Sequence, residues 1–396
     1  MKKYIQQIKG DKAIWAIAGI LAVLSFGPVY SSSSNLAYLY GSGNTSSYLI
    51  KHGVHLILGF IILFGVHKIP HNYFKALSII LLPVVIVLLI YTLTQGTTIE
   101  GANASRWIQI PVVGITFQTS ALAMVVLLVY VASYMSKIKD KVITFKESIL
   151  PLWIPVFLVI ALILPANFST AAILFSMVLL VVFIGGYPLR YIASILGVGV
   201  VMLALFVLTA KAFPGVFPNR VDTWISRVES FTDKKSEEDG YQIEKAKIAI
   251  ATGGVTGLGP GKSVQKNFLP QSSSDFIFAV IIEEYGLAGA LVLMFFYTLL
   301  LVRILIVAGN TDTRFGKLVI VAVGIPIIFQ AIINMAVAVE LFPVTGQTLP
   351  LISSGGTSIW MTCLALGIIL SVSAKRQEIL NETRQESPLD ILSETI

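Results

Sequence analysis

Long apolar stretches recur along the whole chain, each about as long as a membrane is thick. A hydrocarbon core about 30 Å thick is crossed by roughly 20 helical residues, and in lipid the backbone groups of such a segment must pair within it. Only 12% of the 396 residues are charged, against about 25% in water-soluble domains. We therefore expect an all-α polytopic membrane protein with about ten transmembrane helices, because the segments are too long for the strands of a β-barrel. The candidate spans are Ala13–Tyr30, Tyr48–Val66, Phe74–Leu93, Ile115–Met135, Ile149–Leu164, Ser169–Tyr187, Tyr191–Phe213, Phe276–Ala308, Phe315–Leu341 and Ser358–Val372.

The positive charges indicate how these helices are oriented. Lysine and arginine are frequent before the first span and in every second turn after it, whereas the opposite turns hold few of them. Cytoplasmic turns carry this excess, so we expect both termini in the cytoplasm. The long segment 214–274, between the seventh and eighth helices, is then extracytoplasmic. Residues 1–375 form one membrane domain and residues 376–396 a polar cytoplasmic tail, within which we expect residues 377–396 to lack order.

The remaining composition excludes several classes of site. The formal charge of +7 reflects helix-end anchors rather than nucleic-acid binding. Cys363 is the single cysteine, so no disulfide framework or metal cluster is expected. The histidines lack metal-ligand spacing. We expect the first helix to stay uncleaved, although Ser31–Ser34 resembles a small-residue cleavage site.

One carboxylate stands where a polar segment gives way to a membrane span. Asp275 follows a run of serines and precedes the apolar Phe276–Ala279. Two interpretations stay open. Either Ser274 or Asp275 is the N-cap of the following helix, or Asp275 is a general base or charge stabiliser beside an apolar groove, where desolvation raises the pKa of a carboxylate.

A glycine-rich segment, Gly253–Ser263, lies upstream of this site. Part of it resembles a nucleotide-binding P-loop, but Thr256 stands where the first glycine belongs and no hydrophobic strand precedes it. We therefore reject a nucleotide site. The backbone amides and Lys262 are candidates for cradling a phosphate-bearing ligand.

Two more carboxylates, Glu283 and Glu284, lie inside the next apolar run. Ionisable groups at membrane depth are costly and by default mark a functional site. Adjacent helical positions point in different directions, so we expect the two glutamates to have separate surroundings. Arg106, the one cation in the turn Thr94–Gly114, is a candidate partner. A purely structural ion pair is the rival interpretation.

The last long turn, Leu341–Gly356, is rich in proline and glycine, which predicts irregular backbone near membrane depth. Such backbone is tolerated only where it is buried in protein or lines a cavity.

Several separated motifs together resemble the SEDS family (shape, elongation, division and sporulation), whose members include FtsW, RodA and SpoVE. The resemblance runs from the first helix to Val372. The segment Ser263–Lys266 is more similar to the division member, FtsW, than to the elongation member, RodA. The motifs are Gly101–Ile108, Tyr241-Gln242 with Gly253-Gly254 and Gly257–Gly259, Leu269-Pro270 with Asp275–Ala279, Glu283–Gly286, and Pro343–Gly346 with Leu349–Thr357.

The resemblance implies a peptidoglycan glycosyltransferase of the bacterial cytoplasmic (inner) membrane that acts in cell division. Its substrate would be lipid II, the undecaprenyl-pyrophosphate-linked disaccharide peptide, polymerised into glycan strands at the outer face. Its partners would be a class B penicillin-binding protein, other divisome membrane proteins and membrane lipids.

The resemblance also assigns roles to residues. Asp275 takes the catalytic position, as base for the attacking sugar hydroxyl. Lys262, Lys266, Arg106 or a divalent cation (Mg²⁺ or Mn²⁺) would stabilise the departing pyrophosphate, and no residue is assigned as a metal ligand. Trp107 by itself fits the aromatic belt of a membrane interface, but its motif places it near the substrate. The substrate-binding candidates are Arg106, Trp107, Lys262, Gln265, Lys266, Glu283, Glu284, Pro350, Ser353, Gly355 and Gly356.

Two positions depart from the family pattern. Where relatives usually have Gln-Pro-Ser-Glu and a lysine three residues later, this chain has Gln118–Ala121 and Met124. Where they have Gln-Pro-Asp, it has Pro165-Ala166-Asn167. Both changes predict a less charged central cavity.

Other functions stay open beside polymerisation during division. They are a lipid II flippase or transporter, a non-catalytic divisome scaffold and, within the family, an elongation role. Polar residues cluster in the outer turns rather than at the bilayer midplane, which favours the enzyme over the transporter.

Overall fold

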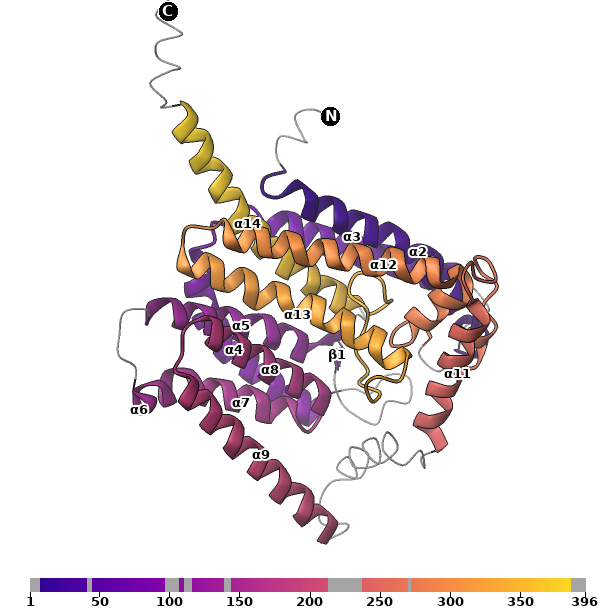
Figure 1. Cartoon of the computed structure of the whole chain (residues 1–396), viewed down its shortest axis with the longest axis horizontal. Helices are drawn as coiled ribbons and strands as arrows, with labels where there is room; N and C mark the ends of the chain where they lie inside the picture. Colours follow the sequence, from indigo (N-terminus) through magenta and orange to yellow (C-terminus); the bar gives the residue numbers. More distant parts are fainter. Residues whose placement is uncertain are drawn as a thin grey trace, which may run out of the picture.

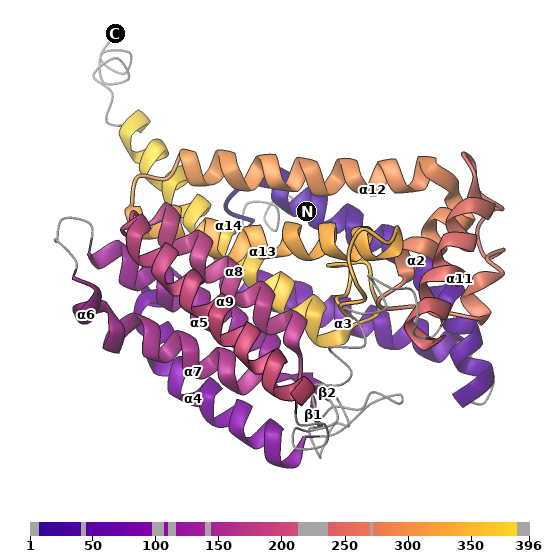
Figure 2. The same cartoon turned by 60° about the horizontal axis from the view of Figure 1, so that its bottom comes forward.

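The computed structural model describes residues 8–40, 45–96, 107–109, 116–138, 144–212, 237–269 and 272–385. Long helices pack side by side into a bundle, with α11 at the end opposite to the last turns of α14 (Figures 1 and 2). The helices are α2 (Lys12–Tyr40), α3 (Thr45–Val66), α4 (Tyr73–Gln95), α5 (Thr119–Lys137), α6 (Phe145–Ser148), the π-helical turn η1 (Ile149–Trp153), α7 (Ile154–Ile163), α8 (Phe168–Ile184), α9 (Leu189–Ala212), α11 (Glu237–Gly253), the 3₁₀ turn η2 (Gln265–Asn267), α12 (Ile277–Gly309), α13 (Arg314–Ala338) and α14 (Gly356–Gln385), and the strands are β1 (Trp107–Gln109) and β2 (Thr116–Gln118).

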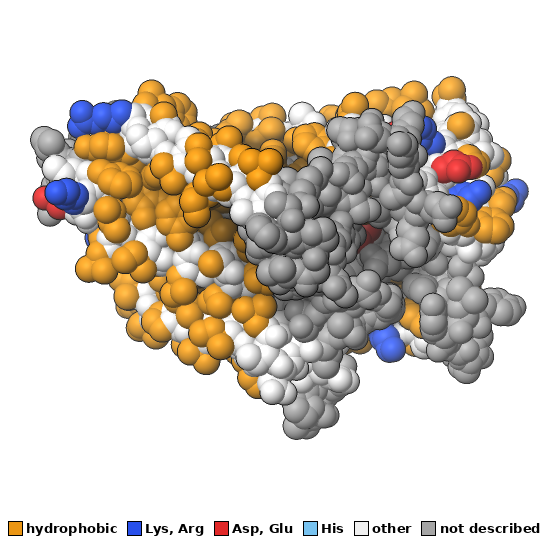
Figure 3. Space-filling model, turned by 90° about the horizontal axis from the view of Figure 1, so that it is seen from below, with side chains coloured by type: hydrophobic (Ala, Val, Ile, Leu, Met, Phe, Trp, Pro, Cys, Tyr) orange, Lys and Arg blue, Asp and Glu red, His pale blue; other side chains and the backbone are white. Residues whose placement is uncertain are grey.

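The helices have the length and composition of membrane spans. Within the described residues, 8 helices are long and apolar enough to cross a membrane, and two shorter apolar helices fall in α8 and α9. Large apolar side chains such as Ile57, Ile80 and Phe295 are exposed. Figure 3 shows apolar side chains spread over one face, with most charged ones toward its two ends. Lipid, not water, suits such a surface, so the chain is an integral membrane protein. The expected fold class is confirmed, and the count of ten crossings stays a prediction.

The span expected at Ile115–Met135 is wrong at its start. Residues Thr116–Gln118 form β2, which pairs antiparallel with β1, and α5 begins only at Thr119. Trp107 pairs with Gln118 and Ile108 with Phe117. β-Branched and aromatic residues favour extended pairing, so this short hairpin replaces the first turn of the expected helix.

The C-terminal expectation is also wrong in part. We expected the last helix to end at Val372 and residues 377–396 to lack order, but α14 continues to Gln385. Glutamine, glutamate, leucine and arginine, which form helices readily, supply most of this extension. In Figure 1, α14 extends beyond the bundle. Residues 386–396 lie outside the described part of the chain.

The N-terminal segment is tied to the ends of two distant helices. The Asp11 carboxylate accepts hydrogen bonds from the amides of Ala13 (2.9 Å) and Ile14 (3.1 Å), which caps α2. It also forms an ion pair with Arg303, near the end of α12. At Gly10, a Cβ would lie 2.7 Å from the carbonyl oxygen of Leu370 in α14. Residues 10 and 11 therefore contact α12 and α14 near one end of the bundle.

We expect Asp11→Ala to lower the free energy of unfolding by about 2–3 kcal/mol, because it removes both the helix cap and the partner of a half-buried arginine. Asp11→Asn keeps a capping oxygen and should lose about half as much. Equilibrium unfolding of the protein in mixed micelles measures both values. Equal losses for the two variants would contradict the assignment of a separate contribution to the ion pair.

Candidate functional site

The turn that carries Asp275 is hydrogen-bonded to the turn Leu341–Gly356. The Ser354 amide donates to the Ser273 carbonyl oxygen (3.0 Å), and the Ser353 hydroxyl donates to the Ser274 carbonyl oxygen (2.7 Å). Asn334 in α13 donates through Nδ2 to the carbonyl oxygen of Asp275 itself (2.9 Å). Asp275 is half-buried. Its backbone is thus held from two sides in a non-helical conformation.

The N-cap interpretation of Ser274 or Asp275 is wrong. Helix α12 begins at Ile277, and Phe276 stands at the cap position without a side-chain cap. The carbonyl groups of residues 273–275 are bonded to Ser353, Ser354 and Asn334, so the turn keeps its own shape. Asp275 therefore precedes the helix rather than capping it.

The irregular turn Leu341–Gly356 is buried in protein, as expected. Leu349, Leu351 and Ile352 are buried, and Leu351 adopts a left-handed backbone with φ 64°. The Tyr297 hydroxyl donates to the carbonyl oxygen of Pro350 (2.5 Å). These contacts satisfy non-helical backbone that lipid could not.

Gly356 has no room for a side chain. A Cβ there would lie 2.6 Å from Cε1 of His55 in α3. The carbonyl oxygen of His55 also accepts a hydrogen bond from the Trp360 indole nitrogen (3.1 Å). A Cβ at neighbouring Gly355 would lie 3.1 Å from Cγ2 of Thr348. The two glycines allow close packing of the start of α14, and these contacts give them a structural role.

A cavity of about 700 Å³, which includes space open to solvent, is lined mainly by α5, α13, α14 and the turn Leu341–Gly356. Asn334 links its wall to the Asp275 turn, because the Nδ2 that binds Asp275 also donates to the carbonyl oxygen of Gln347 (2.7 Å). Ala121 and Met124, the first departure from the family pattern, line this cavity. Every described lining residue is uncharged, so the expectation of a less charged cavity agrees with the structure.

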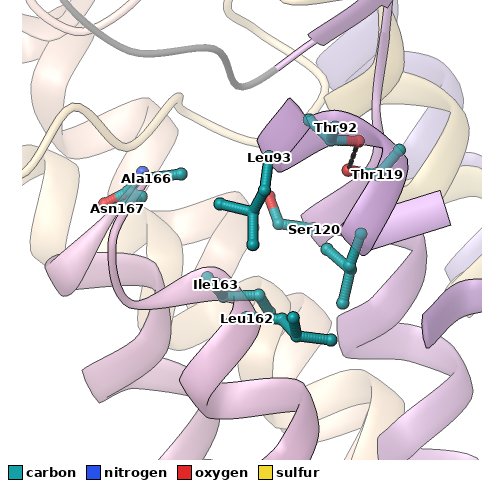
Figure 4. A pocket seen from close by; sticks show the side chains of 9 residues that line it. Thr92, Leu93, Thr119, Ser120, Leu162, Ile163, Ala166 and Asn167 are labelled. Carbon is teal, nitrogen blue, oxygen red and sulfur yellow. Dashed lines mark hydrogen bonds between the residues drawn. The ribbon is translucent and has the colours of Figure 1, made fainter. Parts of the chain in front are cut away.

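Asn167, from the second departure, lines a smaller pocket of about 290 Å³ (Figure 4). Its side-chain oxygen caps α8 through the Thr170 amide (3.1 Å). Across the pocket the hydroxyls of Thr92 and Thr119 form a hydrogen bond (2.9 Å). Asn167 therefore has a structural role at the start of α8.

The glycine-rich segment fills a break in α12. At Gly286 the backbone leaves the helical conformation (φ 68°, ψ −169°). Amides freed by the break, those of Leu287 and Ala288, donate to the carbonyl oxygens of residues 254 and 255 (2.9 and 3.2 Å). In return, the amides of residues 258 and 259 donate to the carbonyl oxygens of Glu283 and Glu284 (both 2.9 Å). The segment thus replaces hydrogen bonds that the helix gives up.

This insertion explains why glycine occupies several of these positions. A Cβ at Gly253 would lie 2.1 Å from the carbonyl oxygen of Ile282, and one at Gly257 would lie 2.2 Å from that of Glu284. On the other side, a Cβ at Gly286 would lie 2.2 Å from the carbonyl oxygen of Val255. Real Cβ atoms do not approach backbone this closely, so the two backbones fit only without side chains.

The carboxylates of Glu283 and Glu284 bind this same segment. The fully buried Glu283 accepts from the hydroxyl of Ser263 and from the amides of Val264 (3.0 Å) and Gln265 (3.2 Å). Glu284 accepts from the Ser263 amide (3.3 Å) and from the hydroxyl of Ser31. The expectation of separate surroundings is wrong, because both carboxylates accept hydrogen bonds from Ser263, Glu283 from its hydroxyl and Glu284 from its amide.

The phosphate-cradle hypothesis is wrong for these amides. The amides of residues 258 and 259 bind backbone, and those of residues 263–265 bind the two glutamates. The segment does surround an anion, but that anion is a carboxylate of the chain itself. The structural interpretation of Glu283 and Glu284 therefore has direct contacts behind it, whereas their contact with substrate stays a prediction.

The cationic candidates are placed as follows. The Lys266 ammonium donates to the Ser31 hydroxyl (2.9 Å) and to the carbonyl oxygen of Gly261 (2.8 Å), and Lys262 is exposed. Arg106 lies outside the described residues. Trp107 is half-buried in β1, beside Gln118 of the cavity wall. The described residues contain no group of three or more His, Cys, Asp or Glu side chains that could hold a metal.

Several residues that organise the site belong to none of the motifs seen in the sequence. Asn334 and Gln347 connect Asp275 to the cavity, and Ser31 and Ser263 bind the paired glutamates. Buried polar residues in apolar helices, such as Asn334 in α13 and Ser31 in α2, were the available signal. Ser31, considered as part of a cleavage site, lies buried within a continuous α2.

We expect Gly257→Ala to lower the free energy of unfolding by about 3 kcal/mol, because its Cβ would collide with backbone and its φ is positive. Gly254→Ala is the matched control. Gly254 also has a positive φ (54°), but nothing lies within 4 Å of its Cβ position, so only the backbone strain of about 1 kcal/mol applies. Thermal unfolding of the three proteins measures the difference. Equal melting temperatures for the two variants would contradict the close backbone contact at Gly257.

Comparison with known proteins gives a consistent result. A family model described as cell cycle protein, FTSW_RODA_SPOVE, matches residues 11–378. The chain is 30% identical over 364 residues to the probable peptidoglycan glycosyltransferase FtsW of Nitrosococcus halophilus, covering 91% of each chain. It is 31% identical over 381 residues to the protein of the same name from Nitrosomonas europaea, covering 93% of this chain and 94% of the relative.

Solved structures agree on the fold. A chain from the work titled "Structural coordination of polymerization and crosslinking by a peptidoglycan synthase complex" aligns with a TM-score of 0.71 and 27% identity, covering 93% of this chain and 98% of that one. The Thermus thermophilus rod shape determining protein RodA aligns with a TM-score of 0.65 and 24% identity, covering 93% and 97%. With the family model matching nearly the whole chain, the protein belongs to the FTSW_RODA_SPOVE family of cell cycle proteins, which is the SEDS family that its motifs indicate.

Proposed function

We propose that this protein is a peptidoglycan glycosyltransferase that polymerises lipid II into glycan strands for septal wall synthesis during cell division. The observation that carries the proposal is Asp275 in a turn held by two hydrogen bonds, from Asn334 to the Asp275 carbonyl oxygen and from Ser353 to that of Ser274, and joined through Asn334 and Gln347 to a cavity within a membrane bundle. Relatives matched over almost their full length are named as glycosyltransferases of this kind.

The chemistry requires a base and a stabilised leaving group. Asp275 takes the proton from the attacking sugar hydroxyl. The oxygen of that hydroxyl forms a bond to the anomeric carbon of the growing chain. The bond from that carbon to the pyrophosphate oxygen breaks, and undecaprenyl pyrophosphate leaves with the electron pair. A fixed backbone at Asp275 keeps the carboxylate positioned without reorganisation during the reaction.

Cations must offset the charge that develops on the pyrophosphate. We assign this to Lys262, Lys266 and Arg106. Lys266 is already positioned by Ser31 and Gly261, and Lys262 is exposed nearby on the same segment. A divalent cation, Mg²⁺ or Mn²⁺, would supply the same stabilisation at the substrate pyrophosphate, and we propose no protein ligand for it.

The membrane context and the partner complete the proposal. The positive-inside pattern supports cytoplasmic termini and an extracytoplasmic face for the 214–274 segment and Asp275. A class B penicillin-binding protein would crosslink the strands, since a structural neighbour belongs to a complex described as coordinating polymerisation and crosslinking.

A transporter, a scaffold and an elongation enzyme are the alternatives. The named relatives favour a division enzyme. A transporter would place its polar contacts near the bilayer midplane, whereas Asp275 and the serine turns stand at the start of α12. A scaffold would not need a carboxylate beside a cavity.

We expect Asp275→Asn to abolish glycan strand formation, with a loss of about 100-fold or more, because an amide cannot take the proton. Purified protein with its penicillin-binding partner and lipid II is assayed by gel separation of strands. Asp312→Asn is the matched control, since Asp312 is exposed beyond the far end of α12, whose part after the break, residues 287–309, is about 35 Å long.

Strands made by Asp275→Asn at the normal rate would move the chemistry away from this carboxylate. If wild type also makes none while it binds its partner, the glycosyltransferase proposal fails. A lipid-scrambling measurement then separates the transporter from the scaffold.

A further inference from the structure

We propose that Ser31 in α2 is a positioning residue for the glycosyl transfer. It orients the ammonium group of Lys266 for the substrate pyrophosphate and, with the next residue of α2, holds that cation in register with the Asp275 turn. This inference rests on the proposed function, in which Lys266 offsets the charge of the pyrophosphate.

The Lys266 side chain is held by two acceptors and has one donor to spare. Its ammonium group donates to the hydroxyl oxygen of Ser31 (2.9 Å) and to the carbonyl oxygen of Gly261 (2.8 Å). An ammonium group has three N–H donors, so one of them has no acceptor among the described residues. Lys266 is half-buried, which leaves it accessible to a ligand. An anion that binds there meets a cation that is already in place.

Glu284 determines how the Ser31 hydroxyl is oriented. An ammonium group can only donate, and an ionised carboxylate can only accept. The Ser31 hydroxyl therefore gives its one proton to Oε1 of Glu284 and accepts from Lys266 with its oxygen. Ser31 and Glu284 are both buried, so the bond between them is strengthened by the low dielectric. A chain of hydrogen bonds thus runs from a buried carboxylate to a half-buried cation.

This arrangement holds Lys266 without a direct ion pair. The two ion pairs among the described residues involve other cations, and Ser31 stands between Lys266 and Glu284. A carboxylate in direct contact would compete with the substrate for the ammonium group, whereas a hydroxyl is a weaker acceptor. The serine therefore fixes the cation and leaves its charge for the pyrophosphate.

The same turn of α2 also contacts the segment that leads to Asp275. The hydroxyl of Ser272 donates to the carbonyl oxygen of Ser32 (3.4 Å), and both serines are buried. Ser32 is the residue after Ser31, and Asp275 comes three residues after Ser272. Two consecutive residues of one helix thus contact the cation and the catalytic turn. The distance between Lys266 and the Asp275 turn is therefore controlled by α2.

The first test is the rate of strand synthesis by the protein and its penicillin-binding partner over a range of lipid II concentrations. We expect Ser31→Ala to lower kcat about 10-fold, as for the loss of one hydrogen bond to a charged group. KM should rise by no more than about threefold. Negative charge on the pyrophosphate grows as its bond to the sugar breaks, so an oriented cation acts mainly in the transition state.

Two further variants serve as controls. Ser31→Thr keeps the hydroxyl and should keep kcat within about twofold of wild type. Ser34→Ala removes a hydroxyl from the next turn of α2 that donates only to the carbonyl oxygen of Ser31 (2.7 Å), and it should leave kcat unchanged. The melting temperature of each variant checks that it folds.

A double-substitution cycle separates positioning from a purely structural role. Lys266→Met removes the cation. Because Ser31 acts through Lys266, the variant with both Ser31→Ala and Lys266→Met should have the kcat of Lys266→Met alone. A serine that only supports packing would lower kcat about 10-fold in either background. That result would overturn the proposal, as would a normal kcat in Ser31→Ala.

A binding measurement gives the same comparison when Lys266→Met makes no strands. Farnesyl pyrophosphate, which carries a terminal pyrophosphate like the leaving group, is titrated into the protein in phosphatidylcholine nanodiscs. We expect Ser31→Ala to weaken its binding about 10-fold, Lys266→Met to weaken it at least as much, and the double variant to bind no more weakly than Lys266→Met. Farnesol should bind all four proteins equally. Losses that multiply in the double variant, or unchanged binding in Ser31→Ala, contradict the proposal.

The outcomes separate this inference from the proposed function. Normal strand synthesis by Ser31→Ala, with none by Asp275→Asn, removes the positioning role alone. If wild type makes no strands but Ser31→Ala weakens pyrophosphate binding through Lys266, the positioning role stands and the glycosyltransferase proposal fails.

Discussion

The glycine-rich segment fills the break in α12, and the structure at that end of the bundle depends on this contact. A helix that breaks near a membrane leaves amides and carbonyls that lipid cannot satisfy. Here residues 254–259 supply partners for both the amides after the break and the carbonyls before it. Glu283 and Glu284 then secure the rest of the segment through Ser263 and its neighbours. The cost of burying Glu283 is thus offset by several donors, whereas Glu284 accepts hydrogen bonds at Oε1 and keeps Oε2 buried without a described partner.

The same rule explains how Asp275 can sit outside regular structure. Two non-helical turns, one before α12 and one before α14, satisfy each other through Ser353, Ser354 and Asn334. Because each turn uses the carbonyls or amides of the other, neither is free to extend the helix that follows it. The backbone of the Asp275 turn is therefore fixed and is joined to the cavity wall through Asn334. A base must be positioned in this way.

The sequence by itself determined the membrane class and most helix positions, and it made Asp275 the candidate base, because each rests on local patterns: apolar length, turn residues and a lone carboxylate at the edge of a span. It also showed that Leu341–Gly356 had to be buried or line a cavity. Only the tertiary structure decided what the glutamates bind, why Gly257 and Gly356 have no side chain and which residues line the cavity. The physical reason is distance along the chain. Ser31 and Glu284 are 253 residues apart, and the hydrogen bond that joins them exists only once the helices have packed.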